Sequence, residues 1–591
     1  MSSSLRGRIA LAALAFSALA PIPAFAQTPL PDFQADYFTG SGVCVMCHTQ
    51  LKDSTGKDVS IDTAWRATMM GNAARDPFWR MVLRGELIAN PQLRTVIEDK
   101  CSTCHMPMAR TTAATDKKPV GILDDGFANP KHELNLMALD SVSCTLCHQI
   151  TPDKLGSKES YTGHYTIGSV KNKIAGGEKG QPEIYGQYTP TEKAEEMTGG
   201  SGFAPKRSPH IQDSALCGSC HNLYTPFVKT NGEMGEGEVA EQAPYTEWEN
   251  SAFFGQKSCQ QCHMPTADGK VALSVSGGDP HHGFKQHYFV GGNYYMLEIL
   301  RKYGQEIGTP GAPEDFAKNI ALTIDYLGQE TAAVAIKEPA IAMDGSQVTF
   351  DVEVRNGAGH KFPTAYPARR AWLHTSVIDR FGNVAFESGA SRPDGSIVGN
   401  DEDTLPNAYE PHYSLITSPK QVQIYQAGLG DSDGVPTTTL LKSAKYLKDN
   451  RLLPLGFDKD KAPHDVQVFG DAKQDARFVA GGHTVSYKVD VRQFHAPFTV
   501  ETELLYQPMN YRWVKNLANV HAQTPNAEAE TFLRYYRETP NLPARVAWAA
   551  MTPQLRNPAS VFIAPPVKAE EPAKDAGTKV EPAKKEEPAK K

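Results

Sequence analysis

The stretch Ser143-Cys144-Thr145-Leu146-Cys147-His148 contains the most informative pattern of the sequence, because the pattern recurs four more times along the chain. Each copy has two cysteines separated by two residues and followed at once by a histidine. The copies begin at Cys44, Cys101, Cys144, Cys217 and Cys259, and together they use all ten cysteines of the 591 residues. Since no cysteine is left over, the sequence argues against a general disulfide framework and against a free catalytic thiol.

The spacing within each copy suits the covalent attachment of haem c. Two thiols three residues apart lie on one helical turn, where they can add to the two vinyl groups of one haem, and the next residue then lies under the iron. A zinc site needs two such pairs to converge and no histidine after each pair, and a thioredoxin-like site needs one pair near a βαβ pattern. We therefore predict five covalently bound haem c groups. The attachment cysteines are Cys44, Cys47, Cys101, Cys104, Cys144, Cys147, Cys217, Cys220, Cys259 and Cys262, and the proximal iron ligands are His48, His105, His148, His221 and His263.

A haem that only transfers electrons usually has a second protein ligand on its iron, whereas a catalytic haem leaves that position open. Six further histidines lie in the same part of the chain and are candidates for this distal position: His132, His164, His210, His281, His282 and His287. We predict that His132, His164 and His210 are distal ligands. From the last three, which have glycine-rich flanks, we choose His287, with His281 and His282 as alternatives.

This set is one histidine short of five distal ligands. The segment Trp65–Asn72 contains Met69 and Met70, and a thioether ligand raises the reduction potential of a haem. Met70 is the predicted fifth distal ligand, with Met69 as its alternative, and Met106 and Met108 as weaker candidates. Methionines also fill gaps in cores, and if none of these four binds iron, one haem is open and a catalytic function gains weight.

Composition and patterning divide the chain into four parts. Residues 1–26 have an n-region with Arg6 and Arg8, an apolar run and the cleavage sequence Ala24-Phe25-Ala26, which is typical of a secretory signal peptide. Residues 27–330 form the predicted pentahaem domain, which is mostly irregular with short helices. Residues 568–591 contain mostly Lys, Glu, Pro and Ala, so we expect a disordered tail. No run of about 20 apolar residues follows the signal, so we predict no transmembrane segment.

Residues 331–567 change to a period of two, as in Val348–Val354, where apolar and polar side chains alternate. This pattern predicts an antiparallel β-sandwich-like domain, with Val485–Val491 and Thr499–Tyr506 as a later pair of strands. A late helix near Glu528–Arg537 is expected to pack on the sheet edge. The predicted fold class is therefore α+β and multidomain, and the helices expected in the first domain are 63–93, 293–303 and 313–328.

Charge excludes one class of partner. The formal net charge is −7, so bulk nucleic-acid binding has no electrostatic support. In the β region, Arg369 and Arg370 are candidates to neutralise haem propionates, and the acidic run Asp401–Asp403 is a weak candidate for Ca²⁺.

Several segments of the sequence resemble the multihaem cytochromes c of the cytochrome c-554-like group. They are Trp65–Trp79, Cys101–Met108, Ser141–Ile150, His210–Thr225, Cys259–Pro265 and His287–Asn293. In that group the residue matching Met70 is frequently histidine, so the methionine here is a departure. Asn356–Arg370 and Lys448–Phe457 resemble a domain found downstream of such haem domains in some bacterial members. The resemblance implies electron transfer in the periplasm or at the cell surface, often in anaerobic or metal-linked respiration.

Two functions follow from these observations. The first is an exported pentahaem c-type cytochrome that transfers electrons through closely packed six-coordinate haems of a bacterial respiratory chain. Its partners would be other cytochromes or a membrane quinol-linked complex. The alternative is a haem-dependent reductase of nitrogen oxyanions, hydroxylamine or peroxide with one open iron. All five motifs end in histidine and none in lysine, which favours the electron carrier over an enzyme.

Overall fold

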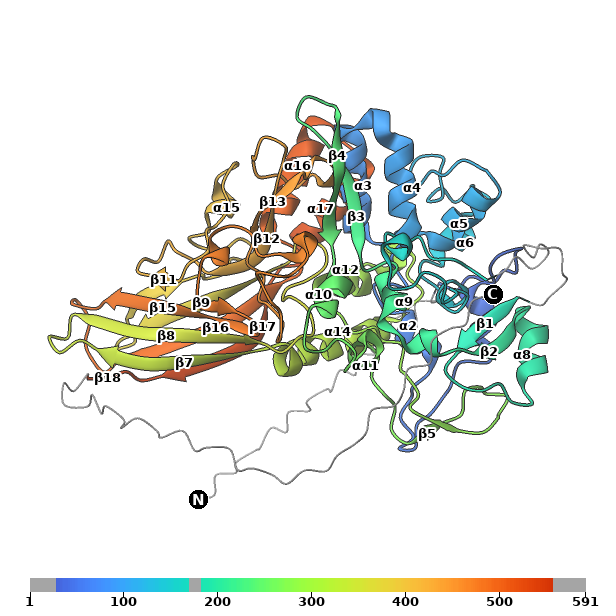
Figure 1. Ribbon diagram of the computed structural model, residues 1–591, viewed down its shortest axis with the longest axis horizontal. Coiled ribbons are helices and arrows are strands. Elements are labelled where there is room, and N and C mark those ends of the chain that lie inside the picture. Colours follow the sequence, from blue (N-terminus) through green and yellow to red (C-terminus); the bar gives the residue numbers. More distant parts are fainter. Residues whose placement is uncertain (1–27, 169–181, 556–591) are drawn as a thin grey trace, which may run out of the picture.

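The computed structural model describes residues 28–168 and 182–555. The predicted signal peptide, the predicted tail and the end of the predicted β domain lie outside the described residues. The described chain combines a region of short helices with a region of β-sheets, which confirms the α+β fold class (Figure 1). Among the residues described, no helix is both long and apolar enough to cross a bilayer.

The first region is built from short helices joined by irregular segments and three small sheets. Its helices are α1 (Ser41–Val45), α2 (Ile61–Trp65), α3 (Pro77–Ala89), α4 (Arg94–His105), α5 (Pro107–Thr115), α6 (Asn135–Leu139), α7 (Cys144–Cys147), α8 (Ala194–Ser201), α9 (Ser214–Gly218), α10 (Pro244–Glu249), α11 (Cys259–His263), α12 (Tyr294–Lys302), α13 (Gly304–Ile307) and α14 (Pro313–Tyr326). Its strands pair as β1 (Glu183–Gly186) with β2 (Ala204–Arg207), β3 (Leu223–Val228) with β4 (Met234–Gln242), and β5 (Lys270–Val271) with β6 (His281–His282).

Two of the three expected helices form as predicted, since α12 and α14 match residues 293–303 and 313–328. The expected helix at 63–93 is wrong as a single element, because it divides into α2 and α3. Between them the side chains of Thr68 and Asn72 bond to nearby backbone groups and hold the segment in turns. Helix α3 then restarts at Pro77, where the Asp76 carboxylate accepts hydrogen bonds from the first free N–H groups.

The second region contains two six-stranded sheets. The first has the order β13-β12-β9-β16-β17 with β10 beside β9, and the second has the order β11-β15-β8-β7-β18 with β14 beside β15. The strands are β7 (Ala332–Ile341), β8 (Gln347–Asn356), β9 (Arg370–Ile378), β10 (Val384–Ser388), β11 (Leu415–Ile416), β12 (Ile424–Gly430), β13 (Lys445–Asp449), β14 (Phe478–Val479), β15 (Gly482–Asp490), β16 (Thr499–Gln507), β17 (Ala544–Met551) and β18 (Gln554–Leu555). All pairs are antiparallel except β11 with β15 and β18 with β7, both at sheet edges.

The two sheets face each other across an apolar core. Along β8 the residues Val348, Phe350, Val352 and Val354 are all buried, as the period of two predicts. Tyr487 of β15 contacts Thr375 and Phe386 of the other sheet, with 3.2 Å between the two hydroxyl oxygens and 6.2 Å between the two rings.

Two expectations for this region are wrong. Strands β15 and β16 do not pair, because the connection at 491–498 carries the chain from one sheet to the other: β15 pairs with β8, and β16 with β9 and β17. Helix α17 (Ala527–Glu538), together with the unpredicted α16 (Tyr511–Gln523), packs on α3 of the first region (Figure 1). The reason is apolar contact between helices, since the Phe532 ring lies 5.3 Å from the ring of Phe78. The largest core therefore spans both regions.

Candidate functional site

Each cysteine–histidine motif forms one helical turn. The backbone N–H of His48, His148 and His221 donates to the carbonyl of the first cysteine of its own motif, at 3.1, 3.0 and 2.8 Å. This turn places the two thiols of a motif on one side. All ten cysteines are free and half-buried, and none is in a disulfide. The motifs therefore keep the thiols that covalent attachment of a haem consumes.

Four of the five motif histidines are held in the same way. In each, ring nitrogen Nδ1 donates a hydrogen bond to a backbone carbonyl far away in the sequence. The pairs are His48 with Leu273 (2.7 Å), His105 with Ala73 (3.1 Å), His148 with Tyr185 (2.6 Å) and His263 with Val290 (2.5 Å). A proton on Nδ1 leaves the lone pair of Nε2 available to a metal, and this bond also fixes the orientation of the ring. Within the described residues the ring of His221 has no such hydrogen bond.

Burial keeps these rings neutral, which is the protonation state that binds a metal. Desolvation lowers the pKa of His105 and that of His221 to about 4. It also lowers the pKa values of the three other motif histidines, His48, His148 and His263.

The five motifs lie against one another. A neighbouring thiol of another motif raises the pKa of one partner in each of three pairs: Cys144 beside Cys44, Cys104 beside Cys220, and Cys217 beside Cys259. Burial raises the pKa of Cys147, and the charge of Cys220 nearby raises it further. The first motif thus lies beside the third, the fourth lies beside the second and the fifth, and the third lies near the fourth.

The structure brings His287 to the third motif. Its ring lies 6.4 Å from that of His148, with 23° between the two ring planes. Nδ1 of His287 donates to the carbonyl of Lys285 at 3.0 Å, and burial lowers its pKa to about 3. The alternatives lie elsewhere: His281 stacks on Tyr188, and His282 is exposed on β6.

The other three predicted histidine ligands are placed differently. His164 is exposed. Nδ1 of His132 accepts the N–H of Leu134 at 3.1 Å, so its proton resides on Nε2. His210 uses both ring nitrogens, since Nε2 donates to the carbonyl of Ile150 at 2.7 Å and Nδ1 lies 2.6 Å from the hydroxyl of Ser208. In these conformations neither His132 nor His210 offers Nε2 to a metal.

The methionine candidates separate into two groups. Met106 and Met108 are completely buried in a core cluster of the first region, and the sulfur of Met108 accepts a hydrogen bond from Thr145. Met69 packs against the largest core, whereas Met70 is half-buried outside it. Of these four side chains, that of Met70 has the least packing role.

The sequence interpretation missed a histidine of the second region that lies beside the fifth motif. The ring of His360, just after β8, lies 6.2 Å from that of His263 with 14° between the planes. The signal was the glycine-flanked segment Gly357-Ala358-Gly359-His360, which has the same local character as the glycine-rich stretch around His287. Desolvation lowers the pKa of both His221 and His360, and the charge of Arg369 nearby lowers both slightly further.

Two charged features of the second region are structural. Arg370 is fully buried and forms a bidentate ion pair with Asp403 at 2.9 and 3.2 Å, so the expectation that Arg370 meets a haem propionate is wrong. The same pair uses the buried carboxylate of the 401–403 run, and Glu402 is bonded to Gln426. The carboxylates of Glu402 and Asp403 are thus hydrogen-bonded to side chains, which argues against a Ca²⁺ site.

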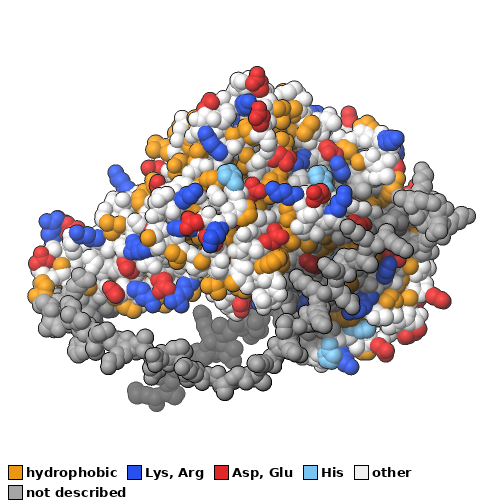
Figure 2. Space-filling model, in the orientation of Figure 1, with side chains coloured by type: hydrophobic (Ala, Val, Ile, Leu, Met, Phe, Trp, Pro, Cys, Tyr) orange, Lys and Arg blue, Asp and Glu red, His pale blue; other side chains and the backbone are white. Residues whose placement is uncertain are grey.

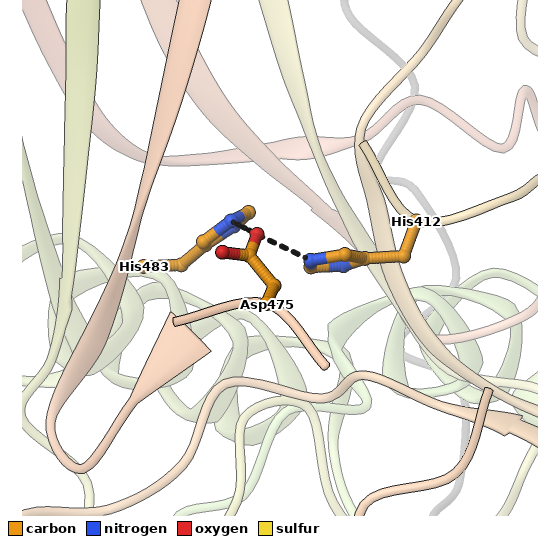
Figure 3. A group of neighbouring side chains, drawn as sticks. All are labelled: His412, Asp475 and His483. Carbon is orange, nitrogen blue, oxygen red and sulfur yellow. Dashed lines mark hydrogen bonds and ion pairs between the residues drawn. The ribbon is translucent and has the colours of Figure 1, made fainter. Parts of the chain in front are cut away.

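A cluster of His412, Asp475 and His483 has the composition of a metal site (Figure 3). Nε2 of each histidine lies 3.1 Å from the same carboxylate oxygen, Oδ2 of Asp475. Nδ1 of His412 faces the amide groups of Gln423 and Asn450 at 3.2 and 3.1 Å.

The orientation of those amides decides what the cluster does. The oxygens of Gln423 and Asn450 accept backbone N–H groups of Tyr413 and Gln426, so their NH₂ groups must face His412. Nδ1 of His412 is therefore an acceptor, and its proton on Nε2 points at Asp475. The cluster is a satisfied hydrogen-bond network, and His412 has no lone pair to offer a metal there.

No family model matches this chain, and no curated protein matches its sequence. Among solved structures, the chain is similar to the crystal structure of a penta-heme cytochrome c552 from Thermochromatium tepidum. The two share 17% sequence identity with a TM-score of 0.47, and the match covers 88% of this chain and 100% of the other.

Proposed function

We propose that the chain is an exported multihaem cytochrome c that transfers electrons, with one haem attached covalently to each of its five motifs. The observation that carries the proposal is the common arrangement of the motif histidines. Four of the five donate Nδ1 to a distant backbone carbonyl and keep Nε2 available, beside two free thiols on the same turn. A haem bound there supplies a one-electron redox centre whose potential is set by its second ligand and by burial.

The packing of the motifs supports transfer between sites. The first motif lies beside the third, the fourth lies beside the second and the fifth, and Cys147 of the third lies near Cys220 of the fourth. The chain thus supplies one contiguous group of attachment points, rather than isolated sites.

Export and partners belong to the same proposal. Residues 1–26 support passage to the periplasm or the cell surface, and the partners are redox proteins, either other cytochromes or a membrane quinol-linked complex. The net charge of −7 favours a basic redox partner over nucleic acid. On the face drawn in Figure 2 acidic and basic side chains are intermixed, which suits transient contacts with a partner.

One observation keeps the haem-dependent reductase as a second candidate. His132 and His210 are both predicted to be second ligands, but Nδ1 of His132 accepts a backbone N–H group and Nε2 of His210 is bonded to a backbone carbonyl. An iron that receives neither of them has an open position, which is what binding of a nitrogen oxyanion, hydroxylamine or peroxide requires.

The test uses the full chain produced in a host that attaches c-type haems. Mass spectrometry of the mature protein should show five haems, and the pyridine haemochrome spectrum should be that of haem c. A reduced protein that binds no CO is an electron carrier, whereas stoichiometric CO binding at one haem supports the reductase. Fewer than five haems would refute the assignment of one haem to every motif.

A further inference from the structure

We infer that His360, from the second region, is the second axial ligand of the haem on the fifth motif, opposite His263. The inference rests on the proposed function, because it requires a haem at Cys259 and Cys262. It goes beyond that proposal by making the β-sheet region part of a haem site.

The separation of the two rings is the first argument. With metal–nitrogen bonds of about 2.0–2.1 Å and each ring centroid about 1.1 Å beyond its nitrogen, two imidazoles on opposite sides of one metal have centroids about 6.3 Å apart. The rings of His263 and His360 lie 6.2 Å apart and only 14° from parallel. This distance is too long for direct stacking contact and matches a pair with one metal between them.

The hydrogen bonds of the two rings are the second argument. Nδ1 of His263 donates to the carbonyl of Val290, and Nδ1 of His360 donates to that of Lys361 at 2.8 Å. Both Nε2 atoms are thus left with a lone pair, and within the described residues neither has a hydrogen-bond partner. Metal-bound histidines are usually held in this way through their other nitrogen.

Two other histidine pairs in the same chain act as references. His148 and His287 repeat the arrangement at 6.4 Å, also with both Nδ1 atoms donating to carbonyls. His412 and His483 differ, since their rings are 4.6 Å apart and their Nε2 atoms are bonded to Asp475. The rings of His412 and His483, which belong to the hydrogen-bond network of Asp475, are thus closer together and have both Nε2 atoms hydrogen-bonded. The rings of His263 and His360 are farther apart, and their Nε2 atoms have no such bonds among the described residues.

The loop that carries His360 is anchored to the first region. The N–H of Lys361 and the hydroxyl of Thr364 both donate to the buried Glu247 of α10, at 3.1 and 2.5 Å. The carbonyl of His360 accepts from Asn356 at 2.9 Å. At Gly359 the backbone runs beside Phe253, whose side chain would lie 3.4 Å from an added Cβ. These contacts fix the position of His360 relative to α11 without using its Nε2.

The experiment compares the intact holoprotein with His360→Ala, with His287→Ala as a positive reference and with the exposed His464→Ala as the matched control. Magnetic circular dichroism and EPR of the oxidised proteins report the spin state of each haem. We expect His360→Ala to convert one haem in five from low spin to high spin and to gain one equivalent of CO binding when reduced. Added imidazole should restore the low-spin spectrum, and His464→Ala should match the wild type.

A second variant distinguishes loss of the iron ligand from loss of folding. His360→Met keeps a ligand of similar reach, so the haem should remain six-coordinate while one of the five potentials rises. If His360→Ala carries five haems and leaves spin state and CO binding unchanged, the inference is wrong and the proposed function stands. If the wild-type chain carries no covalent haem at Cys259 and Cys262, the failure belongs to the proposed function.

Discussion

Arg370 and Asp403 form a buried ion pair, and removing one partner should leave the other charge uncompensated in the interior. Both side chains are almost completely buried, and Arg370 also donates to the carbonyl of Gly395 and to Gln507. In Asp403→Asn the guanidinium loses its counter-charge in a low-dielectric interior, so the free energy of unfolding of the β region should fall by about 3–5 kcal/mol. Urea unfolding followed by fluorescence measures this loss.

The matched control for that variant is Lys461→Ala, which removes an exposed ion pair with Asp458. Solvent screens this pair, so we expect no measurable change in the unfolding midpoint. Equal destabilisation by both variants would show that burial does not decide the outcome.

His412 makes stability depend on pH. Burial lowers its pKa in the folded protein to about 3, whereas an unfolded chain has a histidine pKa of about 6.5. As the pH falls below about 6.5, this histidine binds a proton in the unfolded state but not in the folded state. The free energy of unfolding therefore decreases until the pH reaches about 3. In His412→Asn the slope of unfolding free energy against pH should be smaller by about one proton between pH 6 and 4.

The same measurement separates the hydrogen-bond network from a metal site. Because Nε2 of His412 is protonated toward Asp475, neither a chelator nor added Zn²⁺ should shift the unfolding midpoint at pH 7. A midpoint that rises with Zn²⁺ in the wild type, but not in His412→Asn, would overturn that assignment.

At the scale of elements, the pairing of β15 with β8 depends on one glycine. Gly482 lies opposite Arg355, and an added Cβ would lie 2.2 Å from the backbone carbonyl of Val354. Gly482→Ala should force the strands apart at this end, at a cost of about 1–3 kcal/mol. The control is Gly199→Ala in α8, where an added Cβ meets open space and alanine favours the helix. Thermal unfolding of both variants tests the contrast, and a neutral Gly482→Ala would contradict it.

The elements that could be predicted are those whose signal is local. The alternating residues of β8 and the apolar face of α14, with Pro313 at its first position, specify a strand and a helix by themselves. The pairing of β15 and the docking of α17 could not be predicted, because each depends on a partner far away in sequence. Helix α16 was missed although its signal is local, since Trp513, Val514, Leu517 and Val520 recur at helical spacing.

In the whole molecule, the candidate site also combines features that local sequence predicts with features that depend on distant segments. The motifs with their thiols and first histidines are encoded by adjacent residues and could be read directly. A second ligand is chosen by how segments from distant parts of the chain meet, which is why glycine flanks pointed to His287 while His360 was overlooked. Composition also failed to show that Nδ1 of His132 accepts a backbone N–H group and that Nε2 of His210 donates to a backbone carbonyl.

Glu247 connects the two regions, and its removal should separate their unfolding. Its carboxylate, fully buried on α10, forms an ion pair with Arg451 at 2.8 Å, and Arg451 shares Asp449 with Lys361. In Glu247→Gln two cations face a single carboxylate, and the Lys361 loop loses a charged acceptor. We expect a loss of about 3–5 kcal/mol and, in calorimetry, two transitions in place of one, because the variant loses a buried ionic connection between the regions.

The double variant Glu247→Gln/Arg451→Met distinguishes an uncompensated charge from a lost packing contact. Removing the cation as well leaves Lys361 paired with Asp449, so the double variant should be more stable than Glu247→Gln alone. Additive losses from the two single changes would instead mean that the residues act independently. In that case the position of His360 would depend on the surrounding apolar contacts rather than on this ion pair, and the fraction of high-spin haem in Glu247→Gln would equal that of the wild type.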